Sequence, residues 1–125
     1  MASAAPPLPR WLTVSTGPAP VVVDGRACQT RAAFFEELAR VLHLPDYFGR
    51  NWDALADSLR DATRAGGVAL VVEHAEELLS AEPPAQFATL LAVLADAADT
   101  GLTMTLCTDP GHEALLRRRA ATALA

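Results

Sequence analysis

The stretch VALVVE, residues 68–73, decides the fold class of this chain. It is a short run of apolar, mainly β-branched residues, which is typical of a β-strand. Its residues are apolar at successive positions, as in strands of a parallel sheet that helices cover. The pair Gly66-Gly67 before it ends a helix, and Pro83-Pro84 after it opens another. The strand therefore lies between two helices, which indicates an α/β fold.

Two further runs have the same character. PVVVDG, residues 20–25, closes with a turn signal, and LTMTLCT, residues 102–108, is the last of the three. Strands separated by helices pair in parallel through right-handed crossovers. We therefore expect an α/β fold with a three-stranded parallel sheet covered by helices, in the order β-α-α-β-α-β plus a C-terminal helix.

Apolar residues at helical spacing predict the helices between and after these strands. Thr30 is suited to cap the first helix and Asn51 the second, because their side chains accept hydrogen bonds from the free N–H groups of a first turn. The expected helices span residues 31–43, residues 52–65, residues 83–99 and a short tail that starts at Asp109-Pro110.

The length of 125 residues suits one compact domain. Five of the nine prolines fall in the first twenty residues, so that segment is expected to be extended rather than helical. The predicted organisation is a proline-rich N-terminal extension at 1–20, one domain at 21–108 and a C-terminal helical tail at 109–125.

The charge balance restricts the class of partner. The net charge is −5, whereas nucleic acids and anionic membranes require a basic surface. All ten basic residues are arginine, so the chain has no lysine for a Walker-type phosphate loop or a Schiff base. A basic protein is therefore the expected partner, with no nucleic acid and no membrane.

The cysteines and the N-terminus point to a reducing compartment. Cys28 and Cys107 lie in or beside apolar runs and are too few for a disulfide framework, so we interpret them as reduced core residues. The first twenty residues lack the charged and apolar regions of a signal peptide. The expected location is the cytoplasm.

The acidic stretch LPDYFGRNWDALADSL, residues 44–59, is the strongest candidate for function. With Trp52 at 0° on a helical wheel, Asp53 falls at about 100° and Asp57 at about 140°, on a solvent-exposed side. The alternative interpretation is that Asp57 forms an ion pair with Arg60 or Arg64.

The aromatic pair Tyr47-Phe48 favours a binding role for this stretch. Two adjacent aromatic residues in a short connection cannot both point into one core, so one of them is expected to face solvent. An exposed tyrosine beside two carboxylates has the composition of an interface hot spot for a basic partner.

This stretch resembles the barstar family, in which leucine, proline, an acid, two aromatics, glycine, asparagine, aspartate, alanine and leucine occur in this order. The resemblance covers about residues 21–108 and implies a small barstar-like fold. It also implies an intracellular inhibitor, monomeric when free, that plugs the active site of a secreted guanyl-specific ribonuclease in a one-to-one complex. No catalytic residue, metal or cofactor is implied. The expected partner-binding residues are Tyr47, Phe48, Gly49, Asn51, Trp52, Asp53, Asp57 and Asp96.

Two positions depart from the family's pattern. Ala56 stands where the best-known member has a tryptophan, and Arg50 where it has an acid. Two alternatives stay open: a barstar-like module for a different toxin or partner, and a small hydrolase that uses Asp53 or Asp57 with His74. The three histidines show no metal-ligand spacing, so no metal site is expected.

Overall fold

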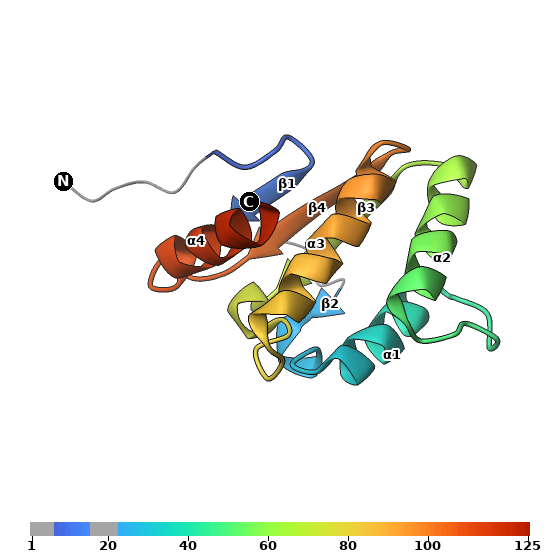
Figure 1. Cartoon of the computed structure of the whole chain (residues 1–125), viewed down its shortest axis with the longest axis horizontal. Helices are drawn as coiled ribbons and strands as arrows, with labels where there is room; N and C mark the ends of the chain where they lie inside the picture. Colours follow the sequence, from blue (N-terminus) through green and yellow to red (C-terminus); the bar gives the residue numbers. More distant parts are fainter. Residues whose placement is uncertain (1–6, 16–22) are drawn as a thin grey trace.

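The computed structural model describes residues 7–15 and 23–125 (Figure 1). The strands are β1 (Leu12–Ser15), β2 (Val23–Asp24), β3 (Val68–Glu73) and β4 (Leu102–Cys107). The helices are α1 (Arg31–Val41), α2 (Trp52–Ala65), α3 (Pro84–Ala98) and α4 (Glu113–Leu124), with short 3-10 turns η1 (Gly25–Ala27) and η2 (Ala75–Glu77). The expected α/β class is confirmed.

The sheet has the strand order β1-β4-β3-β2, and all neighbouring strands are parallel. It has four strands rather than the three expected. The additional strand, β1, lies in the segment expected to be a proline-rich extension, and it pairs Leu12 with Met104 of β4. Leu12 and Val14 are buried, so β1 adds core residues and also covers an edge of β4 that would otherwise be unpaired.

The first expected strand is only partly described. Val23–Asp24 forms β2 and pairs with Val72 and Glu73 of β3. Residues 20–22, which complete the expected run, lie outside the described residues.

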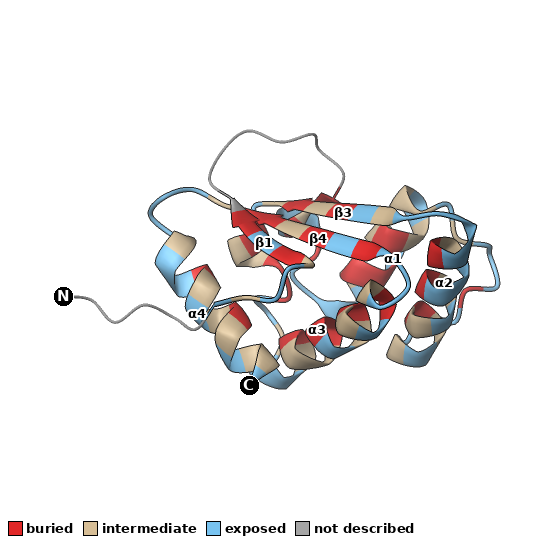
Figure 2. Cartoon of the chain, turned by 90° about the horizontal axis from the view of Figure 1, so that it is seen from above, coloured by how far each residue is buried: buried red, intermediate tan, exposed pale blue. Residues whose placement is uncertain are grey.

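Within residues 7–15 and 23–125, the helices lie on one face of the sheet (Figure 2). On the covered face Leu70, Val72 and Met104 are buried, whereas Ala69 and Thr103 on the opposite face are exposed. The strand β4 fits a sheet covered on one face, because it alternates between buried apolar residues and threonines. The fold is a two-layer arrangement whose core lies between the sheet and the helices.

The core is built around aromatic side chains of α1. Phe34 and Phe35 are buried, and Trp52 at the start of α2 packs edge-on against Phe35 with ring centroids 4.9 Å apart. Aromatic pairs of this geometry add about 0.5–1.5 kcal/mol beyond the area they bury. This contact positions the beginning of α2, which carries the acidic residues.

The two cysteines are both free and buried, as expected. Burial raises the pKa of the Cys28 thiol to about 12. Since the thiolate is the reactive form, this residue acts as an unreactive core side chain.

The C-terminal helix begins later than expected. Asp109 Oδ1 accepts a hydrogen bond from the His112 N–H at 3.1 Å, which closes a turn, and the helix starts only at Glu113. Leu116 is buried, and α4 packs against α3 and β1. Within the described residues, none of the helices combines the length and apolarity needed to cross a membrane.

Candidate partner-binding face

The connection between α1 and α2 separates its two aromatic residues. Tyr47 is 88% exposed, whereas Phe48 is 5% exposed and packs edge-on against Phe35 with ring centroids 6.1 Å apart. The expectation that one of the two faces solvent is confirmed. Phe48 was also predicted to contact a partner, and in the structure its ring belongs to the core. Its role is to anchor the connection that presents Tyr47.

Arg50 holds the connection in place rather than adding free positive charge to it. Its backbone has a left-handed φ of 49°, and its guanidinium donates to both carboxylate oxygens of Glu36 on α1 and, at 2.7 Å, to the Phe48 carbonyl. The Arg50 hydrogen bond lowers the pKa of Glu36. The neighbouring Gly49 is exposed, and a Cβ there would approach the Ala54 Cβ and the Asn51 Nδ2 to 3.2 Å.

Asn51 is the N-cap of α2, as its position predicts. Its Oδ1 accepts from the Ala54 N–H at 2.8 Å, and its Nδ2 donates to the Gly49 carbonyl at 3.1 Å. A cap of this type contributes about 1 kcal/mol. The Asn51 side chain is thus engaged in fixing the start of the helix.

Trp52 is half-buried and directed toward the interior of the fold. Its Nε1 donates to Gln86 Oε1 of α3 at 3.1 Å, and its ring contacts Phe34 and Phe35. This side chain joins α2 to both α1 and α3. Its contribution to a partner surface is therefore mainly to hold α2 in position.

Asp53 and Asp57 are exposed one turn apart on α2, as the helical wheel predicts. Asp53 lies in the first turn, where the positive end of the helix stabilises a carboxylate. Asp57 Oδ1 accepts from Arg60 Nη1 at 3.0 Å, which is the local pairing that the sequence left open. Both residues of this pair are largely exposed, and such pairs contribute about 0–1 kcal/mol.

Asp96 of α3 faces the same region of the molecule. It lines a small hollow between α2 and α3 together with Ala56 and Arg60, and Val93, Ala97 and Thr100 complete the lining. The volume of this hollow is about 30 Å³. Since Arg60 also contacts Asp57, the acids of the two helices lie on one surface. We call Tyr47, Asp53, Asp57 and Asp96 the acidic face.

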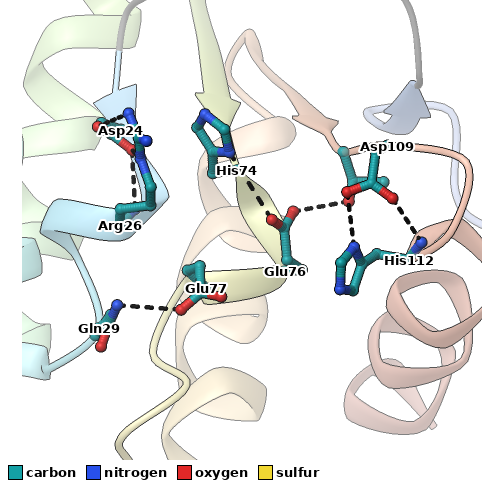
Figure 3. A network of polar contacts seen from close by, with 9 residues as sticks. Asp24, Arg26, Gln29, His74, Glu76, Glu77, Asp109 and His112 are labelled. Carbon is teal, nitrogen blue, oxygen red and sulfur yellow. Dashed lines mark hydrogen bonds and ion pairs between the residues drawn. The ribbon is translucent and has the colours of Figure 1, made fainter.

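A second polar cluster lies where β3 and β4 end (Figure 3). Glu76 accepts a hydrogen bond from the Thr108 hydroxyl at 2.7 Å and lies 3.9 Å from His74 Nδ1. His112 Nδ1 lies 2.7 Å from Asp109 Oδ2. The carboxyl ends of neighbouring parallel strands meet at one edge of a sheet, which brings these residues together.

This cluster contains groups that could hold a cation, although their spacing in the sequence gave no sign of it. One ligand atom from each of Glu76, Asp109 and His112 lies within 4.8 Å of the others. Carboxylates and imidazole are ligands that several divalent ions accept. The hydrogen bond between His112 and Asp109 raises the pKa of His112 and lowers that of Asp109. The described side chains thus already supply partners for one another.

The opposite side of α3 forms an apolar cavity with α4. This cavity has a volume of about 480 Å³, and Phe87, Leu115 and Arg119 are among the residues that line it. The Arg119 guanidinium lies 3.9 Å from the centre of the Phe87 ring. Burial lowers the pKa of Arg119, and its Nη1 has no hydrogen-bond partner in the described part of the chain.

Comparison with known proteins gives a family for the chain. The family model described as Barstar (barnase inhibitor) matches residues 19–109, which is more than half of the sequence. The chain belongs to the barstar family. No curated protein matches it. The family match includes the connection before α2, α2 itself and α3, whereas β1 and α4 lie outside it.

Proposed function

We propose that this protein is an inhibitor of a secreted guanyl-specific microbial ribonuclease, which it blocks with the acidic face. Membership of the barstar family, whose description names a barnase inhibitor, supports an inhibitor rather than an enzyme. The observation that carries the proposal is the exposure of Tyr47, Asp53 and Asp57 on a segment that is otherwise anchored in the core.

The chemistry of a ribonuclease explains why an acidic face suits it. An enzyme that cleaves a phosphodiester holds the phosphate with cationic side chains and N–H donors. Carboxylates at Asp53 and Asp57 would accept the same charge-assisted hydrogen bonds. Unlike RNA, they offer no phosphodiester bond to cleave. The inhibitor would therefore act as a substrate mimic that blocks the active site.

The contacts that hold α2 in place favour tight binding through the acidic face. Asn51 fixes the first turn of α2, and Trp52 fixes its orientation against α1 and α3. Side chains on a helix held in this way lose less freedom on binding than side chains on a mobile loop. Complementary charge would also accelerate association with a basic enzyme, most strongly at low salt.

We further propose where the inhibitor acts and how many copies bind one enzyme. A cell that secretes a ribonuclease needs protection before export, so the inhibitor would act in the cytoplasm of that cell. One acidic face on each monomer would give a one-to-one complex.

The hydrolase alternative receives no support from the arrangement of the acids. His74 lies against Glu76 at the end of β3, whereas Asp53 and Asp57 are exposed positions of α2. A general base acts within hydrogen-bond reach of the proton it takes and benefits from an environment that tunes its pKa. A barstar-like module for another partner is the remaining alternative, and it would leave the acidic face intact.

The test is a titration of the purified protein into barnase and several other secreted guanyl-specific ribonucleases. Loss of RNA cleavage at one equivalent is the expected result for at least one of them. Turnover unchanged at a large excess of folded protein, for all of the enzymes, would reject the ribonuclease and favour a different partner. Asp99→Ala serves as a matched variant, because Asp99 is an exposed acid at the end of α3 outside the acidic face.

A further inference from the structure

Arg60 stands among the acids of the acidic face. Its Nη1 donates to Asp57 Oδ1 at 3.0 Å, and the residue lines the hollow between α2 and α3 that Asp96 also lines. An acid therefore lies on each side of it, one on α2 and one on α3. The charges across this part of the surface alternate as acid, base, acid.

Hydrogen bonds between α2 and the segment after α3 hold the backbone beneath this pattern of charges. The hydroxyl oxygens of Thr63 on α2 and Thr100 after α3 lie 2.6 Å apart, and Thr63 also donates to the Arg60 carbonyl at 3.1 Å. Thr63 is buried and Thr100 is exposed, so this bridge lies at the edge of the contact between the two segments. The backbone of Arg60 is thus linked through Thr63 to the segment that follows α3.

The hollow beside Arg60 is small. A volume of about 30 Å³ holds one water molecule or the tip of one side chain. Ala56 contributes to this space because its side chain ends at Cβ. A partner group that reaches Arg60 can therefore approach without a clash against a larger residue at position 56.

The catalytic groups of an RNA-cleaving enzyme offer an explanation for this alternation of acid, base and acid. The enzyme needs cations at the phosphate, and it also needs a general base that takes the proton of the attacking hydroxyl. Glutamate and aspartate are among the side chains that act as general bases. A plug that carried only acids would satisfy the cations but would repel such a carboxylate.

We propose that Arg60 is a specificity-determining residue that pairs with the general-base carboxylate of the target ribonuclease. Asp57 and Asp96 then meet cationic groups on either side of it. This inference rests on the proposed function and narrows it to ribonucleases with a carboxylate base. An enzyme with a histidine at that position would place a group that can become cationic against Arg60 and would bind more weakly.

The test is a double-mutant cycle between the inhibitor and a guanyl-specific ribonuclease whose general base is a glutamate. The inhibitor variants are Arg60→Ala and Arg60→Gln, and the enzyme variant replaces the glutamate by glutamine. Binding is measured by calorimetry, because that enzyme variant has lost its base. We expect each Arg60 variant to bind the unchanged enzyme about tenfold or more weakly, and the loss to disappear against the glutamine variant.

Arg64→Ala is the control, because it removes the same charge from the same helix. The contact of Arg64 is with Asp61, at 3.9 Å between Nη1 and Oδ1, and not with the acidic face. It should weaken binding less and show no coupling to the enzyme's glutamate. Thermal unfolding of each variant checks that the fold is retained.

Two results would overturn the inference in different ways. If Arg60→Ala binds as tightly as the unchanged inhibitor, or more tightly because Asp57 is released, Arg60 is only a counter-ion and the inhibitor function stands. If the unchanged inhibitor binds none of the ribonucleases, the proposed function fails and this inference fails with it.

Discussion

The helices α2 and α4 lie on either side of α3 and use their charged residues in opposite ways (Figure 1). On α2, Asp53 and Asp57 are exposed. On α4, Arg117 donates to Glu113 and to the Val14 carbonyl, and Arg119 lies over the Phe87 ring. Arg117 and Arg119 help to attach α4 to the domain, whereas Asp53 and Asp57 stay exposed at the surface, where Asp57 pairs with Arg60 of its own helix.

This difference shows why a run of charge in a sequence has no fixed meaning. The three consecutive arginines of α4 look like a docking patch, but at least two of them make contacts within the protein. The acids of α2 lie in the segment that matches the barstar family, and α4 lies outside it. The proposed function places partner binding on α2, whereas the contacts of Arg117 and Arg119 attach α4 to the domain.

The largest effect is expected from removal of the α2 acids. Asp53→Ala and Asp57→Ala should each weaken ribonuclease binding about thirtyfold or more, which corresponds to the roughly 2 kcal/mol that marks a hot spot. Inhibition constants measured at low and moderate salt check this, and binding should weaken steeply as salt rises. Asp99→Ala should have a much smaller effect. Equal losses for all three variants would show that overall charge, rather than the acidic face, determines binding.

A smaller effect, a gain in the stability of the fold, is expected from a substitution on α4. Arg119→Met keeps a long side chain on Phe87 and removes a buried guanidinium nitrogen that has no hydrogen-bond partner in the described structure. An unsatisfied buried donor costs about 1–3 kcal/mol, and the lost cation–π contact offsets part of this. The free energy of unfolding should rise by about 1 kcal/mol in urea denaturation, with ribonuclease binding unchanged. A clear loss of stability would contradict the role given to Arg119.

The cap of α2 should link stability to binding. Asn51→Ala removes the acceptor for the Ala54 N–H and should lower the free energy of unfolding by about 1 kcal/mol. Binding should also weaken, since a frayed first turn holds Asp53 less firmly. Asn51→Ser provides the control, because serine is a good cap and should restore most of both losses. Failure of serine to restore binding would indicate a direct contact of Asn51 with the partner.

The smallest effect is expected at the ends of β3 and β4. Asp109 has a lowered pKa and His112 a raised one, because each stabilises the charged form of the other. The pair therefore stabilises the fold most between these two pKa values. Its contribution is lost as the pH falls through the pKa of Asp109 or rises through that of His112.

The stability difference between the unchanged protein and His112→Ala should follow this dependence in urea unfolding at pH values from about 3 to 9. Ala114→Ser, at an exposed position of α4, should give a difference that does not vary with pH. A difference for His112→Ala that also stays constant with pH would mean that the ion pair does not form in solution.

Local patterns in the sequence were sufficient for most elements. The apolar run at residues 68–73 and the cap at Asn51 depend on neighbours along the chain, and both appear as expected. The strand β1 was missed because it forms only by pairing with β4, a partner far away in the sequence. The sequence of β3 alone did not indicate which face the helices cover, since Val71 is apolar yet only partly buried.

The candidate site was likewise predictable from the sequence only where local patterns determine it. Helical periodicity places Asp53 and Asp57 on the exposed side of α2, and the aromatic pair predicts one exposed ring. Which ring that is depends on the contact between Phe48 and Phe35. The hollow shared by Arg60 and Asp96 depends on how α2 packs against α3, which no local pattern encodes.

The measurement that tests the central claim most directly is a map of the binding surface. Amide chemical shifts of the labelled protein, recorded with and without an inactive variant of a ribonuclease that it inhibits, would locate the contact. The account predicts that the largest changes fall at residues 46–57 of the connection and α2 and around Asp96 of α3, with α4 unaffected. Changes concentrated instead around Leu115 and Arg119 of α4 would contradict it and would move partner binding to the other side of α3.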